Sequence, residues 1–320
     1  MDHCVIIDEA QVLPEIFTAR RPLIDARRKP ARFVLLGSAN PALVKRIAET
    51  LAGRVIYIEI GQINLLEAEN SNITLKDHWF RGGFPDALLA KSTRAWNYWT
   101  SSFISAYIQR DLNFLFSIDL SPETIQRIWS MLAHLNGALE NTENLGRSLG
   151  ITGTTVKRYL DFLQGAYLIL RLPAWYVNAG KRLVKSPKLY LRTSGILHYL
   201  LNISDWDALQ GHPAVGASWE AYVVEQIYQL KNKQTSMYFY RTHNGAEVDI
   251  VLVKGITPLA CIEIKYSNSP VVTRGFYECM HDLKTETNYV ITPGSEKWKM
   301  KEGILVCSLK EFILNELGKL

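Results

Sequence analysis

The chain has 320 residues, of which 48% are hydrophobic and 21% are charged, and its mean hydropathy is −0.03. This composition is typical of soluble globular proteins and excludes a disordered, collagen-like or coiled-coil chain. The 36 basic and 31 acidic residues give a net charge of only +5, so only the distribution of charge can indicate a partner.

The sequence also indicates the cellular compartment of the protein. No run approaches the roughly 18 uncharged apolar residues that a membrane helix requires, and the N-terminus lacks a signal-peptide pattern. The cysteines show no metal-like spacing; they are Cys4, Cys261, Cys279 and Cys307. We therefore expect a multidomain protein in the reducing cytoplasm, without a membrane partner.

The first sixty residues alternate between two kinds of pattern. Short apolar runs predict buried strands at residues 4–7, 32–40 and 55–60. Helical patterns lie between them, at residues 13–24 with a break near Pro22, and at residues 41–51. This alternation indicates an α/β layered domain.

Two acidic residues follow the first strand. Asp8 can hold Mg²⁺ at the carboxyl end of the strand, and Glu9 can orient the water that attacks a γ-phosphate. A strand that simply ends in solvated acids explains the pair equally well. Ser38 and Asn40, which end the next predicted strand, favour the nucleotide interpretation because they would lie beside Asp8 and could sense the phosphate.

Three segments together resemble a known family. They are Ile-Ile-Asp-Glu-Ala-Gln at residues 6–11, Leu-Gly-Ser-Ala-Asn at 36–40 and Leu-Ala-Gly-Arg at 51–54. The set resembles the second half of an AAA+-type ATPase module. It is most similar to prokaryotic ATP-binding proteins that carry a C-terminal domain called DUF4143.

The resemblance assigns roles to the polar residues of this region. It implies that Asp8 is the Mg²⁺ residue, Glu9 the catalytic acid and Ser38 or Asn40 the sensor, with ATP and Mg²⁺ as the family's cofactors. Arg54 would then contact the nucleotide or a neighbouring subunit. A solvated arginine after a helix is an equally good explanation of Arg54.

One motif of such an ATPase does not occur in the 320 residues. The G-x-x-x-x-G-K-[ST] loop, whose amides and lysine cradle the phosphates, is absent. We expect the chain to begin within the module, after its first strand, P-loop and following helix, through truncation, a mispredicted start or gene decay. The missing part of the module and a second copy of the chain are then candidate partners.

We predict that this polypeptide alone does not hydrolyse ATP, because the groups that bind the phosphates are missing. The measurement is ATP turnover by the purified chain and by its Glu9→Gln variant. A turnover rate that depends on Glu9 would contradict the prediction.

A helical region follows the predicted ATPase segment. Gly-Gly-Phe-Pro at residues 82–85 predicts a turn, and aromatic residues at helical spacing predict a helix over residues 92–112. Both resemble the region that follows the ATPase core in the same family. Arg110 and Asp111, near the end of this helix, are better explained as a structural ion pair than as a site.

Residues 121–195 have the pattern of a winged helix. Ser121 and Pro122 begin a capped helix, and residues 144–163 predict two short helices around a turn at Gly150. Strands at about 166–172 and 186–191 would form the wing.

This unit is rich in basic residues. Residues 142–190 contain eight basic side chains and two acidic ones, which suits contact with phosphates. The candidate DNA- or RNA-binding residues are Arg147, Thr154, Lys157, Arg158, Lys181, Arg182 and Lys185. Winged helices also dock proteins, so a protein partner remains an alternative.

The C-terminal part carries a third set of candidate residues. Glu220 lies in a predicted helix, Asp249 in a predicted strand, and Glu263 and Lys265 near the end of the next strand. Because residues two apart in a strand share a face, Glu263 and Lys265 should point the same way, with Asp249 alongside. This ordered set resembles the PD-(D/E)xK nuclease-like fold.

That second resemblance implies a metal-dependent chemistry. Asp249 and Glu263 would bind Mg²⁺ or Mn²⁺, Glu220 would assist from its helix, and Lys265 would be the catalytic lysine. A same-face ion pair between Glu263 and Lys265 explains the Glu-x-Lys pattern without any activity.

The sequence thus predicts an α/β multidomain protein. The expected units are the C-terminal half of an AAA+-type module (1–66), a helical lid-like region (67–120), a winged helix (121–195) and a PD-(D/E)xK nuclease-like domain (205–320). The leading hypothesis is a nucleic-acid-associated family member that has lost ATP hydrolysis. The alternatives are a Mg²⁺-dependent nuclease and a non-enzymatic protein that binds a partner through vestigial sites.

Overall fold

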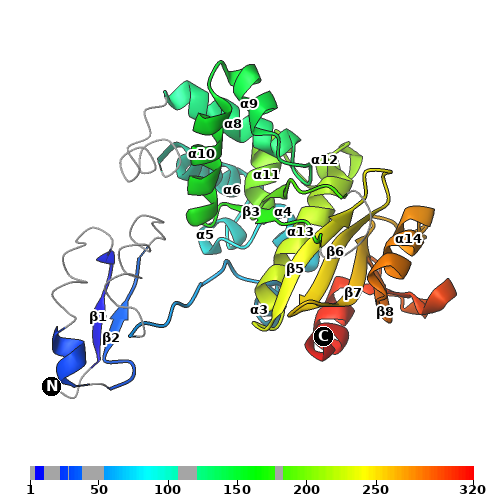
Figure 1. Ribbon diagram of the computed structural model, residues 1–320. Helices are drawn as coiled ribbons and strands as arrows, with labels where there is room; N and C mark the ends of the chain where they lie inside the picture. Colours follow the sequence, from blue (N-terminus) through cyan, green and yellow to red (C-terminus); the bar gives the residue numbers. More distant parts are fainter. Residues whose placement is uncertain (1–3, 11–21, 28, 38–53, 107–120, 177–182) are drawn as a thin grey trace.

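A computed structural model describes residues 4–10, 22–27, 29–37, 54–106, 121–176 and 183–320 (Figure 1). The fold is mixed α/β, as predicted, with a helical part and a six-stranded mixed sheet. None of the described helices is both long and apolar enough to span a bilayer.

The N-terminal segment forms a small parallel sheet. Strand β1 (Val5–Ile7) pairs with β2 (Phe33–Leu35), in register from Val5 opposite Phe33. The first two predicted strands are confirmed, although β2 ends earlier than expected. The predicted helix at 41–51 lies outside the described residues.

The third predicted strand, at residues 55–60, does not form. This segment is not part of any sheet, and Ile56, Ile58 and Ile60 are 86%, 73% and 82% exposed. An apolar run becomes a strand only where a neighbour takes its backbone hydrogen bonds, and the described residues place no strand beside it. The segment instead leads from the β1–β2 sheet to the helical part.

Four helices follow, and aromatic side chains form much of their core. They are α3 (Leu65–Asn70), α4 (Leu75–Arg81), α5 (Pro85–Leu88) and α6 (Thr93–Phe103). Trp79 and Trp96 are fully buried. The predicted helix at 92–112 is confirmed as far as α6 reaches, whereas Arg110 and Asp111 lie outside the described residues.

The middle unit combines three helices with a two-stranded antiparallel sheet. Its elements are α8 (Pro122–His134), α9 (Thr142–Leu149), α10 (Gly153–Gly165), β3 (Ile169–Leu172) and β4 (Lys188–Leu191). Gly150 ends α9 at a φ of 69°, and Thr152 caps α10 by accepting from the Thr155 backbone N–H. The two predicted helices around Gly150 are therefore present.

Three helices connect this unit to the C-terminal sheet: α11 (Ser194–Leu200), α12 (Trp206–Gly211) and α13 (Val215–Leu230). Gly195, the second residue of α11, packs against the end of α4, where a Cβ at Gly195 would lie 2.0 Å from the Arg81 carbonyl oxygen. Only glycine permits this close approach.

The sheet has the order β5-β6-β7-β8-β10-β9. Its strands are β5 (Thr235–Arg241), β6 (Glu247–Lys254), β7 (Thr257–Ile264), β8 (Thr287–Thr292), β9 (Trp298–Lys299) and β10 (Leu305–Ser308). The first three are antiparallel neighbours, and β7 then pairs in parallel with β8. Helix α14 (Arg274–Leu283) makes the crossover between β7 and β8.

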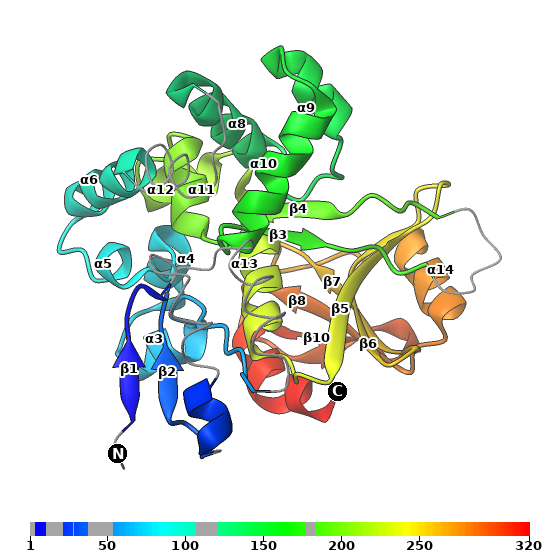
Figure 2. The ribbon, with the colours of Figure 1, turned by 60° about the vertical axis from the view of Figure 1, so that its left-hand side comes forward.

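Apolar side chains on β6 alternate between two cores. Ile250 and Leu252 pack with residues of α13, whereas Val251 and Val253 pack with residues of α14. Figure 2 shows the sheet between these two helices. The period of two therefore holds from Ile250 to Val253, where the strand is buried on both faces.

Candidate functional site

The predicted nucleotide residues are only partly described. Asp8 follows β1, and its Oδ1 accepts a hydrogen bond of 2.9 Å from the Glu9 backbone N–H. Arg54 pairs with Asp25, with 2.7 Å between Nε and Oδ1. Ser38 and Asn40 lie outside the described residues. Asp8 is thus at the carboxyl end of a parallel strand, as predicted. The nucleotide roles of Asp8, Glu9, Ser38, Asn40 and Arg54 stay predictions.

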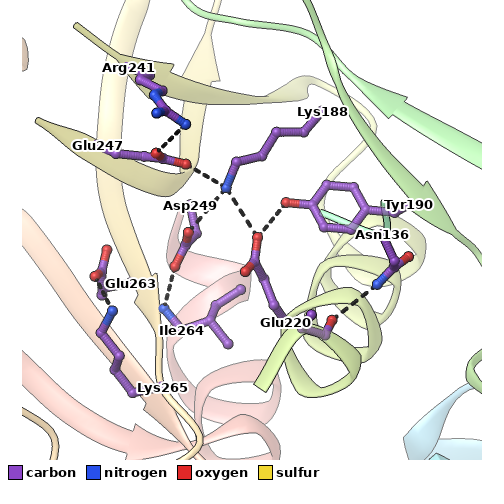
Figure 3. Close-up of polar contacts among 11 residues, drawn as sticks. Asn136, Lys188, Tyr190, Glu220, Arg241, Glu247, Asp249, Glu263, Ile264 and Lys265 are labelled. Atoms are coloured by element: carbon purple, nitrogen blue, oxygen red, sulfur yellow. Dashed lines mark hydrogen bonds and ion pairs between the residues drawn. The ribbon is translucent and has the colours of Figure 1, made fainter. Parts of the chain in front are cut away.

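The C-terminal candidate residues converge at one place. Glu220 comes from α13, Asp249 from β6 and Glu263 from the end of β7 (Figure 3). Lys265 Nζ lies 2.6 Å from Glu263 Oε1, so these two side chains share a face as predicted. The Ile264 N–H donates to Asp249 Oδ2 at 2.9 Å and fixes this carboxylate beside β7.

One of the eight basic residues counted between residues 142 and 190 lies among these acids. Lys188, the first residue of β4, is only 4% exposed. Its Nζ is 2.7 Å from Glu247 Oε1, 3.1 Å from Glu220 Oε1 and 3.3 Å from Asp249 Oδ1. We call Lys188 and these three carboxylates the Lys188 cluster; Figure 3 shows the ammonium pointing into it.

Further polar groups complete the cluster. The Tyr190 hydroxyl donates to Glu220 Oε1 at 2.6 Å, and Arg241 Nη1 lies 3.1 Å from Glu247 Oε2. Asn136 accepts from the Leu191 N–H and donates to the Ala217 carbonyl, which ties β4 to α13. Strand β4 is therefore held against α13 on both sides of Tyr190.

Burial and mutual repulsion alter the acid–base properties of the site. Burial, with a further contribution from Asp249, raises the pKa of Glu263 to about 8 despite the opposing effect of Lys265. Burial and Asp249 also raise the pKa of Glu220. Burial alone would lower the pKa of Lys188, but the surrounding acidic groups outweigh it and the pKa is raised. The Lys188 ammonium therefore stays charged at neutral pH, whereas Glu263 binds a proton more readily than a solvated glutamate does.

Carboxylates in this number are the donors that Mg²⁺ or Mn²⁺ prefers. In the present arrangement, however, the Lys188 ammonium lies where a cation would contact Glu220, Glu247 and Asp249. No three His, Cys, Asp or Glu side chains among the described residues are placed to hold a metal ion. The residues as arranged do not fit a metal, and the metal role of Glu220, Asp249 and Glu263 stays a prediction.

The candidate nucleic-acid residues lie mainly on α9 and α10. Side chains of Arg147, Thr154, Lys157 and Arg158 are exposed, as is Lys185 before β4. Lys181 and Arg182 lie outside the described residues.

Two of the eight basic residues counted in this region are not free for a partner. Arg171 pairs with Asp161 and donates to Glu140 at 2.9 Å. Lys188 is buried in its cluster. The exposed basic footprint is therefore smaller than the sequence count indicated.

Comparisons with known proteins place three regions of the chain in families. Residues 1–68 match the profile described as an AAA domain, residues 72–207 a domain of unknown function (DUF8612), and residues 215–312 a domain of unknown function (DUF4143). The uncharacterized proteins Rv2008c of Mycobacterium tuberculosis and Mb2031c of Mycobacterium bovis are each 36% identical over 301 residues. The alignments cover 94% of this chain and 67% of each relative.

The chain belongs to this family of AAA-domain proteins with a DUF4143 domain. The resemblance drawn from the sequence is confirmed at that level, and the family is AAA ATPase-like. No solved structure matches the chain significantly.

In this AAA–DUF4143 protein, one arginine joins all three matched regions. Arg192, directly after β4, pairs with Glu225 of α13 at 2.9 Å and with Glu59 of the N-terminal match at 2.7 Å. Gln62 donates to the Arg192 carbonyl at 2.6 Å. Both ends of β4 thus carry a buried cation that binds acids of the DUF4143 region.

The sequence analysis assigned no role in the site to Lys188 or Arg192. For Lys188 a signal was present, because Lys188 and Tyr190 lie two residues apart in an otherwise apolar strand, and both bind Glu220. That spacing was the available signal, because it places two polar groups on one face of a short strand.

Proposed function

We propose that this AAA–DUF4143 protein is associated with nucleic acid and that residues 121–195 form a winged helix whose helix α10 contacts the phosphate backbone. The observation that carries the proposal is the group of exposed residues at the start of α10, namely Thr154, Lys157 and Arg158. The succession of α8, α9, α10 and the β3–β4 hairpin, with Leu139 bridged to Lys188, supports the winged-helix assignment.

The charges on this helix are available for phosphates. Neither Lys157 nor Arg158 has an ion pair within the described part of the chain. Each cation that neutralises a phosphate releases condensed counterions, so binding should weaken steeply as salt is added.

The test is the affinity of the full chain for fluorescent single- and double-stranded DNA at increasing salt. With about four phosphate contacts, we expect the dissociation constant to rise on the order of 100-fold between 50 and 200 mM salt. Absent binding, or binding that does not respond to salt, would contradict the proposal and favour a protein partner.

A Mg²⁺-dependent nuclease is the second candidate function. It is favoured by the Glu263–Lys265 pair beside Asp249, and opposed by the position of Lys188. Incubation with circular and linear DNA in Mg²⁺ or Mn²⁺ tests it, with Lys265→Ala and Asp249→Ala as controls. Cleavage that both variants abolish would support it, and cleavage that survives them would assign the activity to a contaminant.

A further inference from the structure

We propose that Lys188 is a built-in cation that takes the place of a divalent metal in the Lys188 cluster and keeps metal out while β4 is docked on α13. The claim concerns the carboxylate site alone. This claim does not rest on nucleic-acid binding, and the experiment that tests it does not measure nucleic-acid binding.

The position of the ammonium carries the first step. Lys188 Nζ lies within 3.3 Å of oxygen atoms from three carboxylates on two different elements, α13 and β6. Its side chain is only 5% exposed, and Nζ also lies 5.8 Å from the centre of the Phe239 ring. A divalent ion in the same space would meet a fixed positive charge at contact distance.

The attachment of β4 carries the second step. The lysine cannot leave the cluster alone, because it begins a strand whose other groups are also bound to α13. Tyr190 donates to Glu220, and Arg192 makes three hydrogen bonds to Glu225. Lys188 would therefore be withdrawn only if this docked strand moved.

The charge balance carries the third step. The site contains four carboxyl groups and three basic side chains that pair with them. The carboxyl groups belong to Glu220, Glu247, Asp249 and Glu263, and the basic side chains to Lys188, Arg241 and Lys265. Removal of the ammonium leaves partly desolvated carboxylates close together, which is strongly unfavourable. Oxygen ligands in this state should accept a divalent cation in its place.

The experiment measures Mn²⁺ binding to the full chain by calorimetry, together with the melting temperature in EDTA and in Mn²⁺. The variants are Lys188→Met and Lys188→Met combined with Asp249→Asn. Arg241→Met is the matched control, since Arg241 also binds Glu247 but has a side chain that is 39% exposed.

The native chain should show no saturable Mn²⁺ binding up to about 1 mM, whereas Lys188→Met should bind one equivalent. Lys188→Met should melt about 10 °C lower in EDTA and regain at least half of this loss in Mn²⁺. Asp249→Asn should abolish the recovery, and Arg241→Met should gain no metal binding.

Two results would overturn the proposal. One is stoichiometric Mn²⁺ binding by the native chain that Asp249→Asn removes, because the site would then hold metal with Lys188 present. The other is a Lys188→Met variant that gains neither binding nor stability in Mn²⁺, including one that fails to fold when Mn²⁺ is present throughout purification.

Discussion

Replacing Arg192 with methionine is expected to lower the free energy of unfolding by about 3–5 kcal/mol, because it leaves a buried carboxylate without its partner. Glu225 is only 2% exposed, and Arg192 contacts both of its carboxylate oxygens. Arg192 also donates to Glu59 at 2.7 Å, so the change further loosens the N-terminal segment. Urea denaturation at pH 7 measures the effect.

Two comparisons isolate the cause of this effect. The combined change Arg192→Met and Glu225→Leu should recover most of the lost stability, since the uncompensated charge is then gone. Arg274→Met, which removes a surface ion pair with Glu278, should cost less than about 0.5 kcal/mol. A single Arg192→Met variant within about 1 kcal/mol of the native chain would contradict the prediction.

Acidification from pH 7 to pH 5 is expected to remove about 2 kcal/mol of stability through one histidine, His198. Burial lowers its pKa from 6.5 to about 4. Its Nδ1 lies 2.8 Å from the Phe80 carbonyl oxygen, and its Nε2 lies 2.6 Å from Ser218 Oγ, which also accepts from Trp79 Nε1. The neutral ring satisfies both contacts, whereas protonation would leave a buried charge.

The sign follows from proton linkage. Between pH 6.5 and pH 4 the unfolded chain binds a proton at this histidine and the folded chain does not, so stability is full above 6.5 and falls as pH decreases. Denaturation at pH 7 and pH 5 should show a smaller loss for His198→Gln than for the native chain. His281→Gln, at an exposed histidine paired with Glu302, should leave the native pH dependence in place. An unchanged pH dependence in His198→Gln would contradict the assignment.

Local patterns predicted the elements whose causes are local. The cap at Thr152 and the turn at Gly150 fixed α9 and α10, and the period of two correctly placed Glu263 and Lys265 on one face. The prediction of a strand at residues 55–60 was wrong, because an apolar run does not reveal whether a neighbouring strand exists.

The role of Lys188 could not be predicted, because it depends on contacts across the chain. Its partners lie 32, 59 and 61 residues further along, at Glu220, Glu247 and Asp249. A count of basic residues assigns such a lysine to the surface. In the structure the Lys188 ammonium instead pairs with the carboxylates of the site. The exposed basic surface available to nucleic acid is therefore smaller, and the position expected for a metal ion holds an ammonium group.

Charge reversal on α10 tests the proposed nucleic-acid contact most directly. The measurement is the affinity for duplex DNA at a fixed salt concentration. The α10 variant combines Lys157→Glu with Arg158→Glu. The control variant combines Lys233→Glu with Lys254→Glu, which make the same charge change at exposed positions of the DUF4143 region. We predict that the α10 variant loses at least about tenfold in affinity and that the control stays within about threefold of the native chain. Equal losses in both variants, or no loss in the α10 variant, would contradict the proposed interface.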